Sequence, residues 1–378
     1  MEIPTRQDLV TLAEARGEAL VSIYMPTHRA GAATRENPIR FKNLLSEAEE
    51  RLVNSSLGEQ SIETLLAGGR RLIDDYEFWQ NQLDGLALFG SPRGWAVYRT
   101  PLNFPEESRV GARYYLKPLI SLLSEAGVFY TLGLSANQTR LLRCTTHTEE
   151  RVDMDGMPES MADALWADDP EKQLQFRSAG VDGHVFFHGA GGSERDVEDE
   201  YLRYFRRVDT AISPFLKEGN QPLVLACVDY LAPIYREANT YPGLIDGNVG
   251  GSPDRQRDED LRENAWQVLQ PVIEQSLSAD LERYGNLLRT GKTSDDPAEV
   301  ALAAHEGRID TIFVDPDVTK WGSVDAAAHR AQVHDSRRPG DEDLLDIAVA
   351  TALTTDSTIH AATGAVLPDS GVAAIFRY

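Results

Sequence analysis

Cysteine, long apolar runs and positive charge are all scarce in this sequence of 378 residues. The two cysteines, Cys144 and Cys227, are too few for a disulfide framework or a zinc site. Each lies beside an apolar run, so we expect buried free thiols. No apolar run reaches the roughly 20 residues of a membrane helix, and the polar N-terminus lacks the apolar core of a signal peptide. The sequence therefore predicts a cytoplasmic protein with no membrane partner.

The shortage of positive charge limits the possible partners. With 37 basic against 60 acidic residues the net charge is −23, a sign that repels phosphate backbones. This argues against general nucleic-acid binding and against DNA as a partner. Any contact with a ribosome or tRNA would have to use a local basic patch.

The apolar residues, 42% of the chain, are enough to build cores for two or three domains at about 150 residues each. We expect an N-terminal α+β domain over 1–124, a middle domain over 125–272 and a C-terminal domain over 273–378. The first domain is predicted from helices packed on a small sheet, with strands at 19–24, 85–89 and 94–98.

The middle domain begins with a strand hairpin and then alternates helix and strand, which predicts a mixed sheet covered by helices. Its elements are expected at 129–134, 139–143, 194–216 and 222–228. The C-terminal domain alternates in the same way, as a small α/β/α sandwich. It begins in a helix over 272–288, and Asp296 and Pro297 start a second helix that Gly307 ends. Its later elements are expected at 309–314, 341–354 and 371–378.

The most informative motif is His188-Gly-Ala-Gly-Gly-Ser-Glu194, between a predicted strand and the long helix. Three glycines in four residues allow positive φ and a close approach by another molecule, which folding alone does not require. The plainer interpretation is a hairpin tip in which Ser193 caps the helix together with Asp196. We favour Ser193 as a cap over Ser193 as a nucleophile, because Arg195 replaces the second glycine of a Gly-x-Ser-x-Gly elbow.

This loop resembles the Gly-Gly-Gln loop in the middle domain of archaeo-eukaryotic peptide-chain release factors and the related Pelota proteins. Here Gly191-Gly192-Ser193 is followed by a long helix with arginines, and Leu223-Val-Leu-Ala226 resembles the family's next strand. Residues 299–314 and 371–378 resemble the start and the closing strand of its third domain. The segments 24–28 and 229–241 are similar to the bacterial branch, which is predicted to act at the ribosome.

The resemblance implies a ribonuclease H-like middle domain with a protruding Gly-rich loop. It also implies a C-terminal sandwich like the kink-turn-binding ribosomal proteins, a ribosome or tRNA partner, and no cofactor. In the family the glutamine helps to place the water that attacks peptidyl-tRNA, and Ser193 is shorter and carries no amide. The stop-codon-reading Asn-Ile-Lys-Ser is also missing. The resemblance therefore implies ribosome rescue or modulation of translation, without implying hydrolysis of peptidyl-tRNA.

Two groups of basic side chains are candidates for ribosome or RNA contact. The first lies in segment 28–43, where only Glu36 opposes the charges of Arg29, Arg35, Arg40 and Lys42. The second lies in the long helix and consists of Arg195, Arg203, Arg206 and Arg207. Ordinary solvated charge explains the first group equally well, and complementing the helix dipole explains the second.

Two other functions stay open. One is a hydrolase or nuclease that uses the Gly-rich loop with carboxylates such as Asp153, Asp182 and Asp229; the other is a non-catalytic module that binds a protein partner. We predict no metal site. Gly291-Lys-Thr293 lacks the first glycine of a P-loop, and the second Gly-rich segment, 247–253, is interpreted as a connection.

Overall fold

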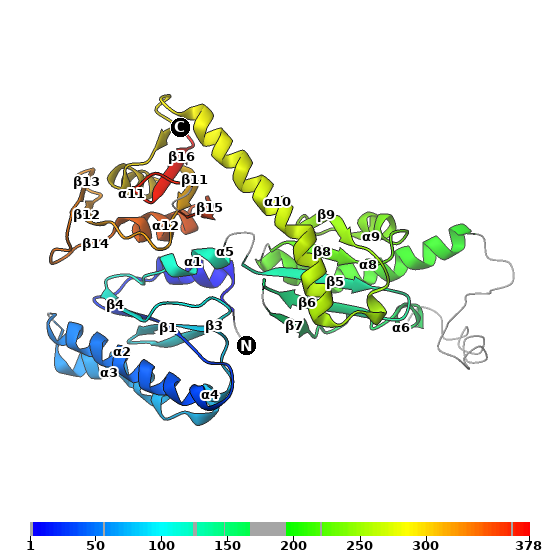
Figure 1. Ribbon diagram of the computed structural model, residues 1–378, viewed down its shortest axis with the longest axis horizontal. Coiled ribbons are helices and arrows are strands. Elements are labelled where there is room, and N and C mark those ends of the chain that lie inside the picture. Colours follow the sequence, from blue (N-terminus) through cyan, green and yellow to red (C-terminus); the bar gives the residue numbers. More distant parts are fainter. Residues whose placement is uncertain are drawn as a thin grey trace. The chain divides into compact units, whose positions relative to one another are not determined.

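The computed structural model describes residues 3–55, 57–123, 127–146, 148–166, 194–219, 221–363 and 366–378 (Figure 1). The chain divides into two compact units. The first consists of Met1–Ser124 with Leu277–Tyr378, and the second of Glu125–Ser276. The expected mixed α and β architecture with several sheets is confirmed. No helix among the described residues is both long and apolar enough to cross a membrane.

The N-terminal part of the first unit is an antiparallel sheet in the order β3-β2-β1-β4. Its strands are β1 (Leu20–Pro26), β2 (Gly85–Ser91), β3 (Gly94–Thr100) and β4 (Glu107–Gly111). Successive side chains of β1 alternate between its two faces. Val21 and Ile23 pack with the helices that cover one face, and Leu20 and Tyr24 belong to a second core. The covering helices are α2 (Glu36–Val53), α3 (Glu59–Ile73) and α4 (Tyr76–Gln80).

The C-terminal part of this unit has a sheet in the order β10-β16-β11-β15. Its strands are β10 (Thr293–Ser294), β11 (Ile309–Val314), β15 (Thr358–Ala361) and β16 (Val372–Phe376). Ile312 packs toward α11 (Pro297–His305) and α12 (Leu344–Thr354), whereas Phe313 packs toward Leu281 of α10 (Asp258–Leu287). Helices thus cover both faces, as in the predicted sandwich.

One hydrophobic core joins the two parts of the first unit. Leu9 of α1 (Arg6–Glu14) and Tyr24 of β1 share it with Val300 of α11 and Leu345 of α12. The 3-10 helix η2 (Lys117–Leu119) and α5 (Ile120–Leu123) also lie here. Each part has a sheet of its own, but the two bury apolar surface together. The three-domain division therefore stays a prediction.

The second unit is a mixed sheet in the order β7-β6-β5-β8-β9. Its strands are β5 (Phe129–Leu134), β6 (Thr139–Cys144), β7 (Glu149–Val152), β8 (Leu223–Ala226) and β9 (Leu244–Val249). The first three are antiparallel, and β8 and β9 run parallel to β5. One face packs with α6 (Met161–Trp166), α8 (Glu194–Gly219) and α9 (Ala232–Ala238).

The other face of this sheet packs with the first half of α10 (Asp258–Leu287) through Leu261, Ala265 and Leu269. The predicted start of this helix near 272 is wrong, since it begins at Asp258 and passes through Pro271. The sequence pattern does not show one continuous helix, because the two halves of α10 bury separate apolar stripes in separate units.

Several elements lie outside the sequence-based prediction. A small sheet, β13-β12-β14, is formed by β12 (Trp321–Asp325), β13 (Arg330–Val333) and β14 (Glu342–Asp343). Its strands are short and mostly polar, and only Gly322 and Asp343 in them are buried, so no apolar alternation marks them. The interpretation of 247–253 as a connection is wrong at its start, because Gly247–Val249 ends β9. Gly and Asn are poor strand formers, and this hides β9 in the sequence.

Candidate functional site

The predicted site centres on the loop that precedes α8. Residues 188–193, with Gly191, Gly192 and Ser193, lie outside the described residues, and so does the proposed cap. The long helix itself is confirmed: α8 begins at Glu194 and has 26 residues. The site is therefore built from α8 and from the second predicted group of cations.

α8 is fixed to its unit by an apolar stripe. Tyr201, Phe205, Val208 and Ile212, predicted to share one face, are all buried in one cluster with the sheet strands. Val197, which comes first in the predicted stripe, is 39% exposed. The helix is thus packed from Tyr201 onward, and its first turns extend beyond that contact.

Buried hydrogen bonds add direction to this packing. The Tyr204 hydroxyl donates to the Ser135 carbonyl over 3.1 Å and also bonds the Thr139 hydroxyl. Asp209, 3% exposed, accepts from the hydroxyl of Ser213 at 2.6 Å and from that of Thr240 at 2.7 Å. Buried polar groups with satisfied partners specify one arrangement. These bonds fix the rotation of α8 and so which side chains face outward.

The outward side chains of α8 include arginines. Arg203 and Arg206 are exposed, and Arg207 is half-buried. Arg206 lies 3.9 Å from Glu237, and both side chains are mostly exposed, so this pair contributes little. Arg195 belongs to the first turn of α8. Although the chain as a whole is acidic, exposed cations on an anchored helix are suited to contact the phosphates of a nucleic-acid partner.

Segment 28–43 is an ordered loop and helix start. Asn37, fully buried, accepts from the His28 backbone N–H at 3.0 Å and donates to the His28 carbonyl at 3.1 Å. Arg29 makes two bonds to Asp84, at 2.7 and 2.6 Å. Arg40 bonds Glu106 at 2.6 Å. These reciprocal contacts hold the loop against the sheet.

The net positive charge of segment 28–43 is smaller in the folded protein than along the sequence, because the fold brings further carboxylates to it. Four basic side chains face Glu36 alone along the chain, but Asp84 and Glu106 raise the acidic count to three. Arg35 and Lys42 are exposed. They are the cations of this group best placed for a partner's phosphates.

The described residues give no support to a catalytic site built from the carboxylates that the hydrolase alternative requires. Asp153 and Asp229 are exposed, and Asp229 accepts a 3.4 Å hydrogen bond from Asn248. Asp182 lies outside the described residues. Within the described ranges, no three His, Cys, Asp or Glu side chains come together in a way that could hold a metal ion.

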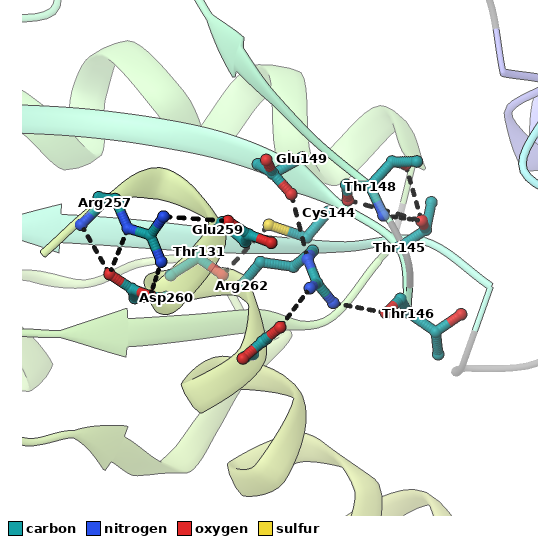
Figure 2. Close-up of polar contacts among 11 residues, drawn as sticks. Thr131, Cys144, Thr145, Thr146, Thr148, Glu149, Arg257, Glu259, Asp260 and Arg262 are labelled. Carbon is teal, nitrogen blue, oxygen red and sulfur yellow. Dashed lines mark hydrogen bonds and ion pairs between the residues drawn. The ribbon is translucent and has the colours of Figure 1, made fainter. Parts of the chain in front are cut away.

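Figure 2 shows polar contacts of the second unit that the sequence analysis missed. Arg262 of α10, 8% exposed, donates to Glu149 at 3.1 Å and to Glu263 at 3.0 Å, and bonds the Thr146 carbonyl. Nearby, Arg140 bonds Asp258 at 2.6 Å. These contacts fix the start of α10 to the β6–β7 hairpin. Apart from Glu263, the partners are more than 100 positions away along the chain, so no local pattern predicts these contacts.

The two thiols are buried and free, as the sequence analysis expected. The Sγ of Cys144 lies 3.5 Å from the Thr131 hydroxyl (Figure 2). Burial raises the pKa of Cys144 to about 12 and that of Cys227 to about 12. A thiol rather than a thiolate is present at neutral pH, so neither side chain is a nucleophile in the folded protein.

The mixed sheet, the long anchored helix and the glycine-rich segment before it lie in the part of the chain that resembles the archaeo-eukaryotic release factor superfamily. Residues 129–271 match the model of the bacterial archaeo-eukaryotic release factor family 7. For this segment, the superfamily recognised from the sequence is thereby confirmed. The match includes the Gly191-Gly192-Ser193 loop and all of α8. No curated protein matches the chain.

Solved structures similar to this chain include an archaeal translation termination factor, aRF1, at 14% identity and a TM-score of 0.25, covering 100% of this chain and 99% of that one. Dom34 of S. cerevisiae is 11% identical with a TM-score of 0.37 and covers 75% of this chain and 73% of its own. A model of ribosome-bound archaeal Pelota and ABCE1 is 10% identical with a TM-score of 0.36, covering 100% and 95%. TM-scores below 0.5 do not establish a common fold.

Proposed function

We propose that this chain is a ribosome-associated, release-factor-like protein that rescues stalled ribosomes or modulates translation. The observation that carries this proposal is the family match over 129–271. It covers the segment in which release factors place their catalytic loop, and here that segment leads into a helix anchored by buried residues. The loop is proposed to reach toward the peptidyl-transferase centre, with the tRNA there and a further protein as partners.

Stop-codon termination is not part of the proposal. Ser193 stands where the family has glutamine, and a hydroxyl cannot present an amide donor and acceptor at the same reach. The glycines remain the functional part of the loop, because they permit close approach to RNA or to a tRNA end.

Net charge constrains how such a protein could bind a ribosome. At −23 the chain is repelled by ribosomal RNA as a whole. We propose that two surfaces provide the attraction, the exposed face of α8 with Arg203 and Arg206, and the exposed cations Arg35 and Lys42. Arg29 and Arg40 act instead by holding the loop that carries Arg35.

The double variant Arg35→Glu/Lys42→Glu is expected to bind ribosomes more weakly. Loss of two phosphate contacts should make the negative slope of log affinity against log salt shallower by about two. The measurement is co-sedimentation with bacterial ribosomes across a salt series. Arg40 is left unchanged because it bonds Glu106 and the Pro26 carbonyl, so its reversal would disturb the fold.

A matched control removes the same charge elsewhere. Arg93→Glu/Arg255→Glu alters two exposed arginines outside both proposed surfaces and should bind like the wild type. An equal loss in both double variants would show that only total charge matters and would remove the assigned surface. Failure of the wild type to sediment with empty, stalled and terminating ribosomes alike would reject the proposed function.

A further inference from the structure

Aromatic rings and guanidinium groups alternate along one row in the first unit. The Arg109 guanidinium carbon lies over the Tyr115 ring, 4.8 Å from its centroid, and over the Trp321 ring at 4.7 Å. Arg337 lies over the same Trp321 ring at 4.8 Å. The row therefore runs from buried Tyr115, whose ring the Lys117 Nζ also approaches to 6.0 Å from the centroid, to exposed Arg337. We call these four residues the stacking row.

The stacking row joins elements that are far apart in the sequence. Arg109 belongs to β4 at the edge of the N-terminal sheet, and Trp321 begins β12 of the small three-stranded sheet. Arg337 lies in the connection between β13 and β14. Folding of the first unit thus holds Trp321 against Arg109 and leaves Arg337 as the exposed last member.

Arg337, at the exposed end of the row, lies near two further arginines, of which Arg51 is 3.5 Å from Glu47. Partial burial, then the like charges of Arg109 and Arg51, lower the pKa of the Arg337 guanidinium. Arg109 is paired with Glu107 at 2.6 Å, but no carboxylate among the described residues forms an ion pair with Arg337. The nearby Asp341 is itself engaged by His334 at 2.8 Å. An anion bound beside Arg337 would relieve this repulsion.

We propose that Arg337 is a stacking platform for an unpaired base of a single-stranded nucleic acid. Because rings and guanidinium groups alternate and the row ends in the Arg337 guanidinium, a ligand that continued it would be a flat π system. Bases stack on arginine planes as they do on aromatic rings. The phosphates that flank the base bring negative charge to Arg337, Arg109 and Arg51. A carboxylate peptide would satisfy the charge but leave the flat face of the guanidinium unused.

This inference goes beyond the proposed function. It assigns a nucleic-acid contact to β12 and the β13–β14 connection, and neither α8 nor segment 28–43 takes part in it. It rests on the stacking row alone and holds whether or not the chain binds ribosomes.

The test uses the full chain and a fluorescein-labelled single-stranded RNA about ten nucleotides long, within the site sizes of single-strand binders. Binding is followed by fluorescence anisotropy at about 50 mM salt. Arg337→Lys keeps the charge and loses the plane, and Arg337→Gln loses the charge and keeps only a smaller, planar amide. We expect both variants to raise Kd at least about fivefold, the loss of one stacked base. A DNA strand of the same sequence distinguishes RNA from DNA as the source of the base.

Arg330→Gln is the matched control, because Arg330 is an exposed arginine in β13 of the same small sheet. It should change Kd less than about twofold, as loss of a distant surface charge does. Thermal unfolding of each variant should match the wild type, since both positions are exposed.

Several results would overturn the platform. Wild-type affinity in Arg337→Lys would show that charge alone binds, and equal losses in Arg337→Gln and Arg330→Gln would show a diffuse field. Displacement of the RNA by a glutamate peptide of equal charge at equal concentration would reassign the surface to a protein. Absence of any binding at about 100 μM protein, the weak end of non-specific binding, would also reject it.

Discussion

Replacing Lys117 with Met is expected to lower the free energy of unfolding by about 3–5 kcal/mol, the cost of leaving a buried charge without its partner. The Lys117 side chain is fully buried, and its Nζ lies 2.7 Å from Oδ2 of Asp343, which is 2% exposed. Lys117 also bonds the Val318 carbonyl. Met keeps the aliphatic volume and removes the cation, so the buried Asp343 carboxylate is left without a cationic partner. Urea unfolding followed by circular dichroism measures the loss.

The control for Lys117 is a second ion pair between the same two parts of the chain. Arg6 lies 3.3 Å from Asp356, but their side chains are 29% and 98% exposed. Arg6→Met should therefore cost less than about 1 kcal/mol. The double variant Lys117→Met/Asp343→Asn should recover much of the loss, since no buried charge is then unpaired. A cost below about 1 kcal/mol for Lys117→Met would contradict this description of the core.

A second large effect is expected at Asp346, also buried where the two parts meet. Burial, and then the charge of Asp343, raises the pKa of Asp346 to about 7. Its Oδ1 accepts from the backbone N–H groups of Leu116 and Lys117 at 2.7 and 2.8 Å. Because the folded pKa is above the unfolded one, the folded protein keeps the proton longer. Stability therefore falls as pH rises from about 4 to about 7.

Asp346→Asn separates this titration from the hydrogen bonds, because the Asn oxygen can still accept from both N–H groups. Wild type and variant should be similar near pH 4, and the variant should be more stable by up to about 4 kcal/mol above pH 7. Denaturant unfolding at a series of pH values measures the difference. A difference that stays constant across the series would show that Asp346 does not titrate in this range.

Much of the fold could be predicted because local chemistry marks it. Asp296 caps α11 through the Ala298 N–H, Pro297 follows it, and Gly307 takes a φ of +70°, all read from residue type. The buried strands β5 and β8 are apolar runs of the expected length. The strands β12 and β13 and the first half of α10 escaped prediction, because tertiary contacts stabilise them more than local pattern does.

The candidate site divides in the same way. The Gly-rich loop and the arginines after it are visible as a motif. The partners of Arg29 and Arg40 are 55 and 66 positions away, so their neutralisation could not be read from the sequence. The stacking row joins Arg109 to Trp321 and Arg337, and only the tertiary fold brings these residues together.

The central claim is that the loop before α8 reaches the peptidyl-transferase centre of a ribosome. Ser193→Cys gives the loop a thiol to which an iron chelate can be attached. Cys144 and Cys227 should not react, since burial raises both pKa values to about 12. Hydroxyl radicals released from the chelate then cut nearby RNA. We predict cuts in the ribosomal RNA of the peptidyl-transferase centre, and a labelled protein that binds ribosomes but cuts only elsewhere would contradict the proposed reach of the loop.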